Sequence, residues 1–187
     1  MNALFAAAAD IEHFCRGHKW RYCIIGGLAV QRWGDPRQTR DVDLTVVTGL
    51  GSEALYIDPL IDHYHARIDG ARAFALANRV VLVETAAGIP LDISLAALPF
   101  EERIIDRASL YEFAPAISIT TCSAEDLVVL KAFAGRTQDW LDIEGILARQ
   151  GTRLNRGLIL EELHPLLDLK EDFQAESTLQ ALFAKHP

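Results

Sequence analysis

Two glycines and two aspartates lie close together in the first quarter of the chain. Gly26 and Gly27 follow an apolar run, and Asp41 and Asp43 open the next one, in the stretch GGLAVQRWGDPRQTRDVDLTVV from residue 26 to residue 47. Residues i and i+2 of a β-strand point to the same face, so the two carboxylates project in parallel. Their negative charges repel each other, and a divalent cation with oxygen ligands, such as Mg²⁺, relieves that repulsion. The triplet D-x-D alone favours a simpler interpretation: a solvated strand face, or Asp41 as a turn cap with Asp43 exposed.

The residues before the aspartates favour a metal site over a solvated strand face. Gly26 and Gly27 close a predicted strand and open a predicted helix, where backbone N–H groups without side chains around them can bind a phosphate. A glycine pair by itself also fits a tight turn. The loop that follows adds phosphate donors: Arg37, Thr39 and Arg40. Together these residues predict a phosphate cradle next to a metal site.

A third carboxylate would complete such a metal site and could act as a base. Asp92 lies in PLDISLA, between Leu91 and Ile93, which would face a core. A charged residue so embedded seldom lacks a partner, so Asp92 is our first choice. Glu84, in VVLVET, is the competing choice and ranks second, because its strand could carry it to solvent.

Periodicity predicts a mixed α/β core over residues 1–121 and a helical lobe over 122–187, packed as one compact unit. In the core we expect helices over 3–16, 28–33, 52–67 and 99–110, and strands over 21–25, 41–47, 79–85, 91–96 and 116–120. In the lobe, Ser123 and Asp126 resemble a capping box ahead of the apolar helix LVVLKAFA. Further helices are expected in DWLDIEGILARQ and over 157–169 and 173–185.

Composition sets the class of protein. Half of the 187 residues are hydrophobic and the net charge is −8, which does not indicate a broad nucleic-acid surface but leaves room for a local basic groove. The cysteines show neither metal spacing nor a disulfide framework, so we expect buried free thiols: Cys15, Cys23 and Cys122. No apolar run approaches the roughly 18 to 20 residues that span a bilayer, and no signal peptide is evident. We expect a soluble cytoplasmic protein without a membrane partner.

The order and spacing of these motifs resemble a known superfamily. G-G, a gap of 13 residues, D-x-D and a later lone carboxylate look like the nucleotidyltransferase fold of the DNA polymerase beta type. The stretch SAEDLVVLKAFAGRTQDWLDIEGIL, residues 123–147, is similar to the P-E-D-L-I-x-L-K-x-x-A-x-R-x-K-D-x-x-D motif of AbiEii-like nucleotidyltransferases, which include toxins of toxin–antitoxin systems. The resemblance covers roughly residues 20–150. It departs from the motif at Gln138, where a basic residue is common.

The resemblance implies a short mixed sheet flanked by helices, with a C-terminal helical lobe, and an enzyme dependent on Mg²⁺ or Mn²⁺. Such an enzyme moves NMP from an NTP to a hydroxyl or amine of an acceptor, here RNA such as tRNA, a protein or a small molecule. A toxin of this family would also have a cognate antitoxin as partner. By position, Gly26 and Gly27 would hold the triphosphate, and Asp41, Asp43 and Asp92 the metal. Lys131 and Arg136 match the basic positions of the helical motif and would contact phosphates or a polyanionic acceptor, with Lys131 also in the catalytic site. Asp142 matches the last acidic position of the motif and would belong to the nucleotide-binding residues.

Simpler roles remain open for the helical motif and for the whole site. Lys131 sits in a mostly apolar helix and could extend its ammonium to solvent, and Asp139 fits an ordinary acid at a helix N-terminus. A non-catalytic module of the same fold, binding a nucleotide or a partner for regulation, is the alternative function. A metal-dependent phosphohydrolase is a third, distinguished by releasing inorganic phosphate in place of pyrophosphate.

Overall fold

The computed structural model describes residues 2–171 and 174–186 of the chain. These form two compact units. The first contains the residues up to Leu28 together with Gln38–Cys122, and the second contains Ala29–Arg37 together with the residues from Ser123 on. The division into residues 1–121 and 122–187 stays a prediction, and the compact units differ from it in residues 29–37 and at Cys122. Residue 173, where the last predicted helix starts, lies outside the described residues.

The first unit is built on a mixed sheet with the strand order β3-β4-β5-β2-β1-β7-β6. Its strands are β1 (Tyr22–Ile24), β2 (Val42–Val47), β3 (His65–Ala66), β4 (Val80–Glu84), β5 (Pro90–Ala96), β6 (Ser109–Ala114) and β7 (Ile117–Thr121). Strand β2 lies in the middle, parallel to β5 and antiparallel to β1. The predicted mixed sheet flanked by helices is therefore confirmed.

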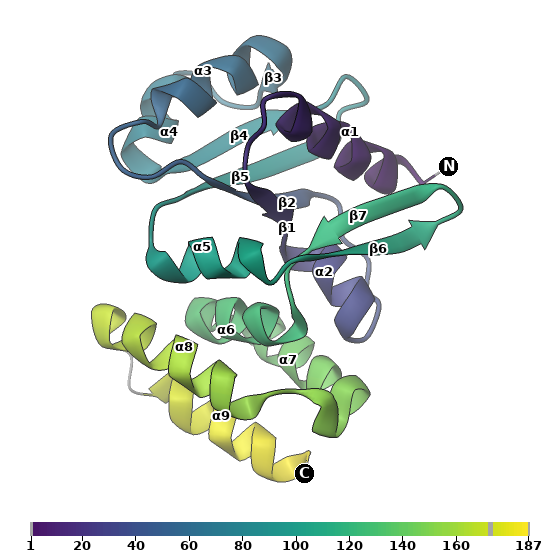
Figure 1. Cartoon of the computed structure of the whole chain (residues 1–187), viewed down its shortest axis with the longest axis vertical. Coiled ribbons are helices and arrows are strands. Elements are labelled where there is room, and N and C mark those ends of the chain that lie inside the picture. The colour runs from purple at the N-terminus through teal and green to yellow at the C-terminus, as the bar shows by residue number, and fades with distance from the viewer. Residues whose placement is uncertain (1, 172–173, 187) are drawn as a thin grey trace. The chain divides into compact units, whose positions relative to one another are not determined.

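Helices cover both faces of this sheet (Figure 1). They are α1 (Ala3–Gly17), α3 (Ala54–His63), α4 (Ala71–Asn78) and α5 (Pro99–Asp106). Apolar side chains of α1, α3 and α4 share one core with β2, β4 and β5, where Leu44, Val81 and Ile93 are fully buried. Helix α5 contacts β1 and β2. Because strand side chains alternate, the residues between the core positions of β2 and β5 face the other side of the sheet.

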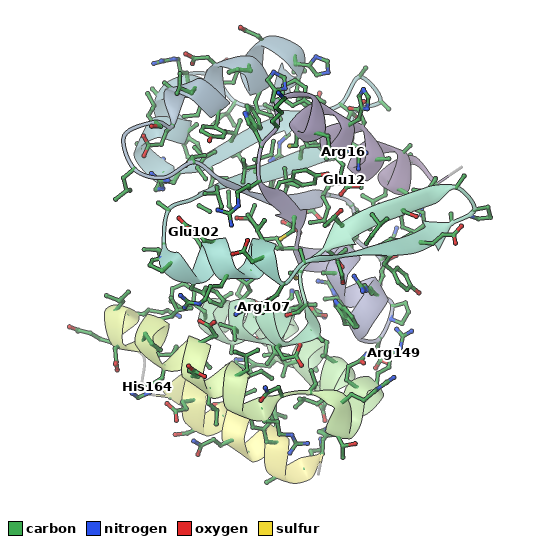
Figure 2. All side chains as sticks on the ribbon, in the orientation of Figure 1. Glu12, Arg16, Glu102, Arg107, Arg149 and His164 are labelled. Atoms are coloured by element: carbon green, nitrogen blue, oxygen red, sulfur yellow. The ribbon has the colours of Figure 1, made fainter. Side chains whose placement is uncertain are left out.

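One charged residue is buried in the packing of α1 against the sheet. Glu12 is fully buried and accepts a hydrogen bond of 2.8 Å from the backbone N–H of Thr120 on β7. Burial raises the pKa of its carboxyl, because the charged form loses solvation. Arg16, one turn away on α1, approaches it to 3.9 Å (Figure 2). Glu12 thus ties the helix to the strand while its carboxyl takes up a proton more readily than an exposed one.

The second unit is helical. It comprises the end of α2 (Gly26–Trp33), α6 (Ala124–Ala134), α7 (Thr137–Gln150), the 3₁₀ turn η1 (Gly151–Arg153), α8 (Arg156–Lys170) and α9 (Gln174–Lys185). Ser123 caps α6 as predicted, since its Oγ accepts a hydrogen bond of 3.0 Å from the N–H of Asp126. Gly135, in the left-handed region at φ +68°, ends the helix. The predicted C-terminal helical region is confirmed over the described residues.

Three elements differ from the expectations. The helix predicted over 52–67 ends at His63 and is followed by the two-residue strand β3; α4 has no counterpart among the predicted elements; and the helix predicted over 99–110 stops at Asp106, before β6. Strand β3 is too short to show alternation, and β6 is an edge strand whose first four residues are all exposed. Without one buried face, neither strand carries the period-two signal that identifies strands in a sequence. The three cysteines are buried thiols that form no disulfide, as predicted.

Candidate active site

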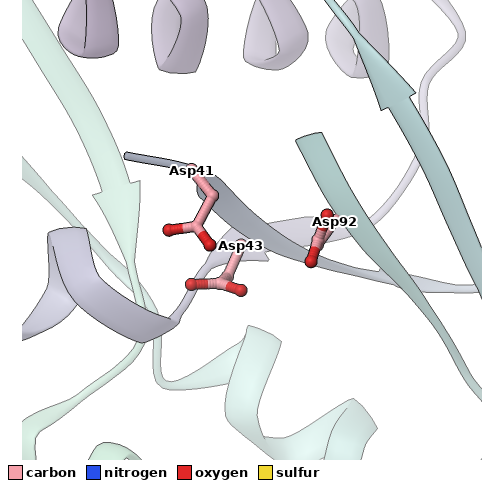
Figure 3. A group of neighbouring side chains, drawn as sticks. All are labelled: Asp41, Asp43 and Asp92. Carbon is pink, nitrogen blue, oxygen red and sulfur yellow. The ribbon is translucent and has the colours of Figure 1, made fainter. Parts of the chain in front are cut away.

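Three carboxylates meet on the face of the sheet opposite the main core (Figure 3). Asp43 lies on β2 and Asp41 just before it, so both extend from the same side of the strand. Asp92 lies on the neighbouring strand β5, directly opposite Asp43 in the parallel register. One oxygen of each carboxylate lies within 4.8 Å of the others, and all three residues are half-buried. The structure thus brings together the three aspartates that the sequence selected for a metal.

The strands hold these acids in place through their buried neighbours. Val42 and Leu44 flank Asp43, Leu91 and Ile93 flank Asp92, and all four apolar residues are fully buried. A shift by one residue would move an aspartate into the core, so the register is strongly specified. Like charges at this separation raise the free energy of the site, and a divalent cation among them would lower it.

Glu84 does not join this group. In the sheet it lies opposite Pro90 and His65, whereas Leu82 is the residue of β4 opposite Asp92. Asp92 is therefore the third carboxylate next to Asp41 and Asp43.

The glycine pair packs directly against Asp43 and Thr39. Gly26 has a φ of +61°, and a Cβ there would lie 1.9 Å from Oδ2 of Asp43. A Cβ on Gly27 would lie 2.4 Å from Oγ1 of Thr39. The first turn of α2 is thus closed to side chains, with the Gly27 N–H donating a long hydrogen bond of 3.4 Å to Oδ2 of Asp43. The glycines thus make room for a carboxylate, a role that the sequence did not reveal.

The loop before β2 contributes one further contact to the site. The hydroxyl of Thr39 donates a hydrogen bond of 2.8 Å to Oδ1 of Asp41. Thr39 therefore joins Gly27, which it touches, to the first aspartate. Arg40 lies next to Asp41 in sequence and is exposed to solvent.

Arg67 is a residue of the site that sequence reasoning missed. Its guanidinium forms an ion pair with Oδ1 of Asp92. Arg67 follows the short strand β3, inside the segment predicted to be a helix, and no spacing or motif in the sequence links it to a residue 25 positions later. Only the order of strands in the sheet places it near the aspartates.

The basic and acidic residues of the helical motif form a network of their own in the second unit. Nζ of Lys131 lies 2.9 Å from Oδ1 of Asp139 and 2.8 Å from Oδ2 of Asp142. Arg37 also binds Asp142, with its Nε 2.7 Å from Oδ1, and Arg136 binds Asp139 with its Nε 2.7 Å from Oδ2. We call these five residues the helical charge network.

Burial decides between the roles considered for Lys131. The residue is only 6% exposed, so its ammonium does not extend to solvent. Two of its three N–H donors are directed to carboxylates, which leaves little room for a phosphate. Asp139 does act as an N-terminal helix acid, because its Oδ2 accepts a hydrogen bond of 3.2 Å from the Arg136 N–H at the start of α7.

The two acids of this network are held in the charged form. Burial alone would raise the pKa of Asp142, but hydrogen bonds from Arg37, Lys131 and Gln138 outweigh it and leave that pKa below its ordinary value. The same balance lowers the pKa of Asp139, through Arg136 and Lys131. Gln138, at the position where the resembling motif has a basic residue, donates to Oδ1 of Asp142 at 3.0 Å.

Solved structures identify the architecture. The chain is similar to the crystal structure of an antigenic nucleotidyltransferase-like protein from Paracoccidioides brasiliensis, with a TM-score of 0.53 and 14% identity over 95% of this chain and 92% of the other. The protein has a nucleotidyltransferase-like fold. It is also similar to the solution structure of the antibiotic-resistance factor ANT(2'')-Ia, with a TM-score of 0.50 and 18% identity over 92% of each chain. At this identity the nucleotidyltransferase-like fold is what the two chains establish.

Other comparisons add nothing to the fold. No protein-family model matches the sequence. No curated protein matches it either. Among residues 2–171 and 174–186, no helix is long and apolar enough to cross a membrane.

Proposed function

We propose that this protein is a metal-dependent nucleotidyltransferase, which moves NMP from an NTP to a hydroxyl or amine of an acceptor. One observation carries the proposal: Asp41, Asp43 and Asp92 meet within 4.8 Å, against the glycine pair that opens α2. The nucleotidyltransferase-like fold supports it, because the acids lie on the strands of that fold.

The donor set fits a hard divalent cation. Three half-buried carboxylates offer oxygen atoms only, which suits Mg²⁺ or Mn²⁺ better than metals that prefer nitrogen or sulfur. Asp41, Asp43 and Asp92 would hold the ion. Bound there, it would supply charge neutralisation for the triphosphate and for the attacking oxygen.

The chain's own groups would bind and orient the reactants. The backbone N–H groups of Gly26 and Gly27 open α2 and would bind the triphosphate, with the exposed Arg40 as a further donor. Thr39 holds Asp41 in position through its hydrogen bond. Asp92 would take the proton of the acceptor. The acceptor oxygen or nitrogen then bonds to the α-phosphorus, the bond from that phosphorus to the bridging oxygen breaks, and pyrophosphate leaves.

The proposal includes three classes of acceptor. The motif over residues 123–147 resembles AbiEii-like enzymes, which supports RNA such as tRNA, or a protein, and a toxin with a cognate antitoxin. The structural similarity to an antibiotic-resistance factor supports a small molecule. A cytoplasmic location agrees with any of them and stays a prediction. For Arg37, Lys131, Arg136 and Asp142 the contacts support a structural role in the helical charge network, and nucleotide binding by these residues stays a prediction.

The test is transfer of label from each α-³²P-labelled NTP with Mg²⁺, using total RNA, total protein and small antibiotics that carry hydroxyl or amino groups as acceptors. We expect label in one acceptor class and one pyrophosphate per transfer. Asp43→Asn should reduce transfer by about 10³-fold or more, since it removes a charge that acts on the transition state. Asp58→Asn is the matched control, because Asp58 is an exposed aspartate of the same unit that pairs with Arg72.

Each contrary outcome has a defined meaning. Binding of NTP without label in any acceptor or in the protein itself would contradict the proposal and favour the regulatory binding module. Release of inorganic phosphate in place of pyrophosphate would favour a phosphohydrolase.

A further inference from the structure

Arg67 and Asp92 lie on one row that crosses the sheet. The Arg67 N–H donates to the carbonyl of Leu82 on β4 at 3.1 Å, and Leu82 lies opposite Asp92 on β5. Asp92 in turn lies opposite Asp43 on β2. Side chains of directly opposed residues point to the same face of a sheet. The guanidinium therefore reaches across Leu82 on the face that carries the aspartates.

The pair is more protected from solvent than an ordinary surface ion pair. The Arg67 side chain is 25% exposed, whereas Arg72, which binds Asp58 with its Nε at 2.7 Å, is 54% exposed. Nε of Arg67 is buried and makes no hydrogen bond to the described residues. Such a pair is screened less by water and salt, so the charge of Arg67 acts strongly on the acids nearby.

We propose that Arg67 is a positioning residue for Asp92, an inference that rests on the proposed function. Its guanidinium occupies Oδ1 of Asp92 and so restricts rotation of the carboxylate on β5. The remaining oxygen is left to face Asp41 and Asp43 and the acceptor. Because a guanidinium presents its donors in a fixed plane, it orients a carboxylate better than an ammonium does.

The position of Arg67 has two opposite effects. Its positive charge next to the aspartates disfavours a bare divalent cation, so removing the charge strengthens cation binding. Its hold on Asp92 favours turnover, so removing it slows the reaction. A residue that only supports the fold would not move these two quantities in opposite directions.

The experiment compares Arg67→Met, Arg67→Lys and the control Arg72→Met. Mn²⁺ affinity is measured by electron paramagnetic resonance without nucleotide, and kcat and KM are measured for the NTP that the protein uses. Arg67→Met should bind Mn²⁺ about threefold to tenfold more tightly. It should lower kcat about 10- to 100-fold, with KM for the NTP changed less than about threefold.

The remaining variants separate charge from orientation. Arg67→Lys keeps the charge, so its Mn²⁺ affinity should stay within about twofold of the wild type while kcat lies between the wild type and Arg67→Met. Arg72→Met should match the wild type in both. If the proposed function is wrong, the wild-type protein transfers no label, while Arg67→Met still binds Mn²⁺ more tightly than the wild type. If the wild type transfers label and Arg67→Met equals Arg72→Met in Mn²⁺ affinity or in kcat, the role of Arg67 is overturned and the proposed function stands.

Discussion

The two groups of charged residues in this protein follow opposite rules. Asp41, Asp43 and Asp92 gather three acids on a half-buried face of a sheet, with Arg67 as the cation that pairs with one of them. In the helical charge network each buried acid has two cationic partners: Lys131 with Arg136 for Asp139, and Lys131 with Arg37 for Asp142. Acids that are buried with cations satisfy the fold, whereas acids gathered with one another keep an excess of negative charge, which the proposed metal would offset. The neighbours of a carboxylate therefore say more about its role than the carboxylate itself.

Lys131→Met should give the largest change in the free energy of unfolding. It leaves two buried carboxylates without their shared cation, and breaking a buried pair in this way costs about 3–5 kcal/mol. Urea unfolding followed by circular dichroism measures the loss. The matched control is Lys185→Met, from an exposed pair with Glu144, which should change the free energy of unfolding by less than about 1 kcal/mol. Equal losses for the two variants would remove the contrast between the groups.

Gly26→Ala should have the next largest effect and lower the free energy of unfolding by about 2–4 kcal/mol. Alanine is strained at this left-handed φ, and its Cβ would also collide with Asp43. Gly88→Ala is the control: Gly88 has a φ of +72°, and a Cβ there would meet nothing within 4 Å, so it tests backbone strain alone. We expect Gly26→Ala to lose Mn²⁺ binding and Gly88→Ala to keep it. Retention of Mn²⁺ binding by both would show that the glycine does not support the aspartates.

Acid should weaken the helical charge network. The pKa of Asp142 is lower in the folded protein than in the unfolded chain. The contribution of Asp142 to the free energy of unfolding is therefore complete at pH values above the ordinary aspartate pKa of about 3.9. It is lost as the pH falls through the lowered folded value. The stability difference between the wild type and Asp142→Asn should stay constant from pH 7 to about 5 and shrink below about 4, by about 1.4 kcal/mol for each unit of pKa shift. A difference that does not change down to pH 2.5 would contradict the pairing.

Asp43→Asn should have the smallest effect on stability and the opposite sign. Removing one of three clustered charges relieves repulsion, so the metal-free protein should gain up to about 1 kcal/mol. Differential scanning fluorimetry should show Mg²⁺ raising the Tm of the wild type and leaving that of the variant unchanged. A variant that loses stability without metal would place Asp43 among the structural acids.

Sequence could predict the acids of the site better than their partners. Asp41 and Asp43 share the alternation of a strand, and Asp92 stands out between buried neighbours, so local pattern is sufficient for all three. Arg67 could not be found, because β3 is too short to be recognised and only the strand order brings it to Asp92. The role expected for Lys131 follows from its place in a motif. The sequence contains its two carboxylate partners, but it does not show that all three residues are buried.

Strands β2 and β5 pair continuously from Val42 with Leu91 to Val47 with Ala96. The spacing of Asp43 and Asp92 is therefore set by the backbone hydrogen bonds between the two strands and does not depend on the length of chain that joins them. Insertions at the exposed Leu50, before α3, should be tolerated as long as both strands still pair, while deletion of a single residue from the middle of β2 would turn an aspartate toward leucine and valine. Natural variation and engineered grafts alike have the freedom to lengthen that connection, and almost none to alter the six paired positions.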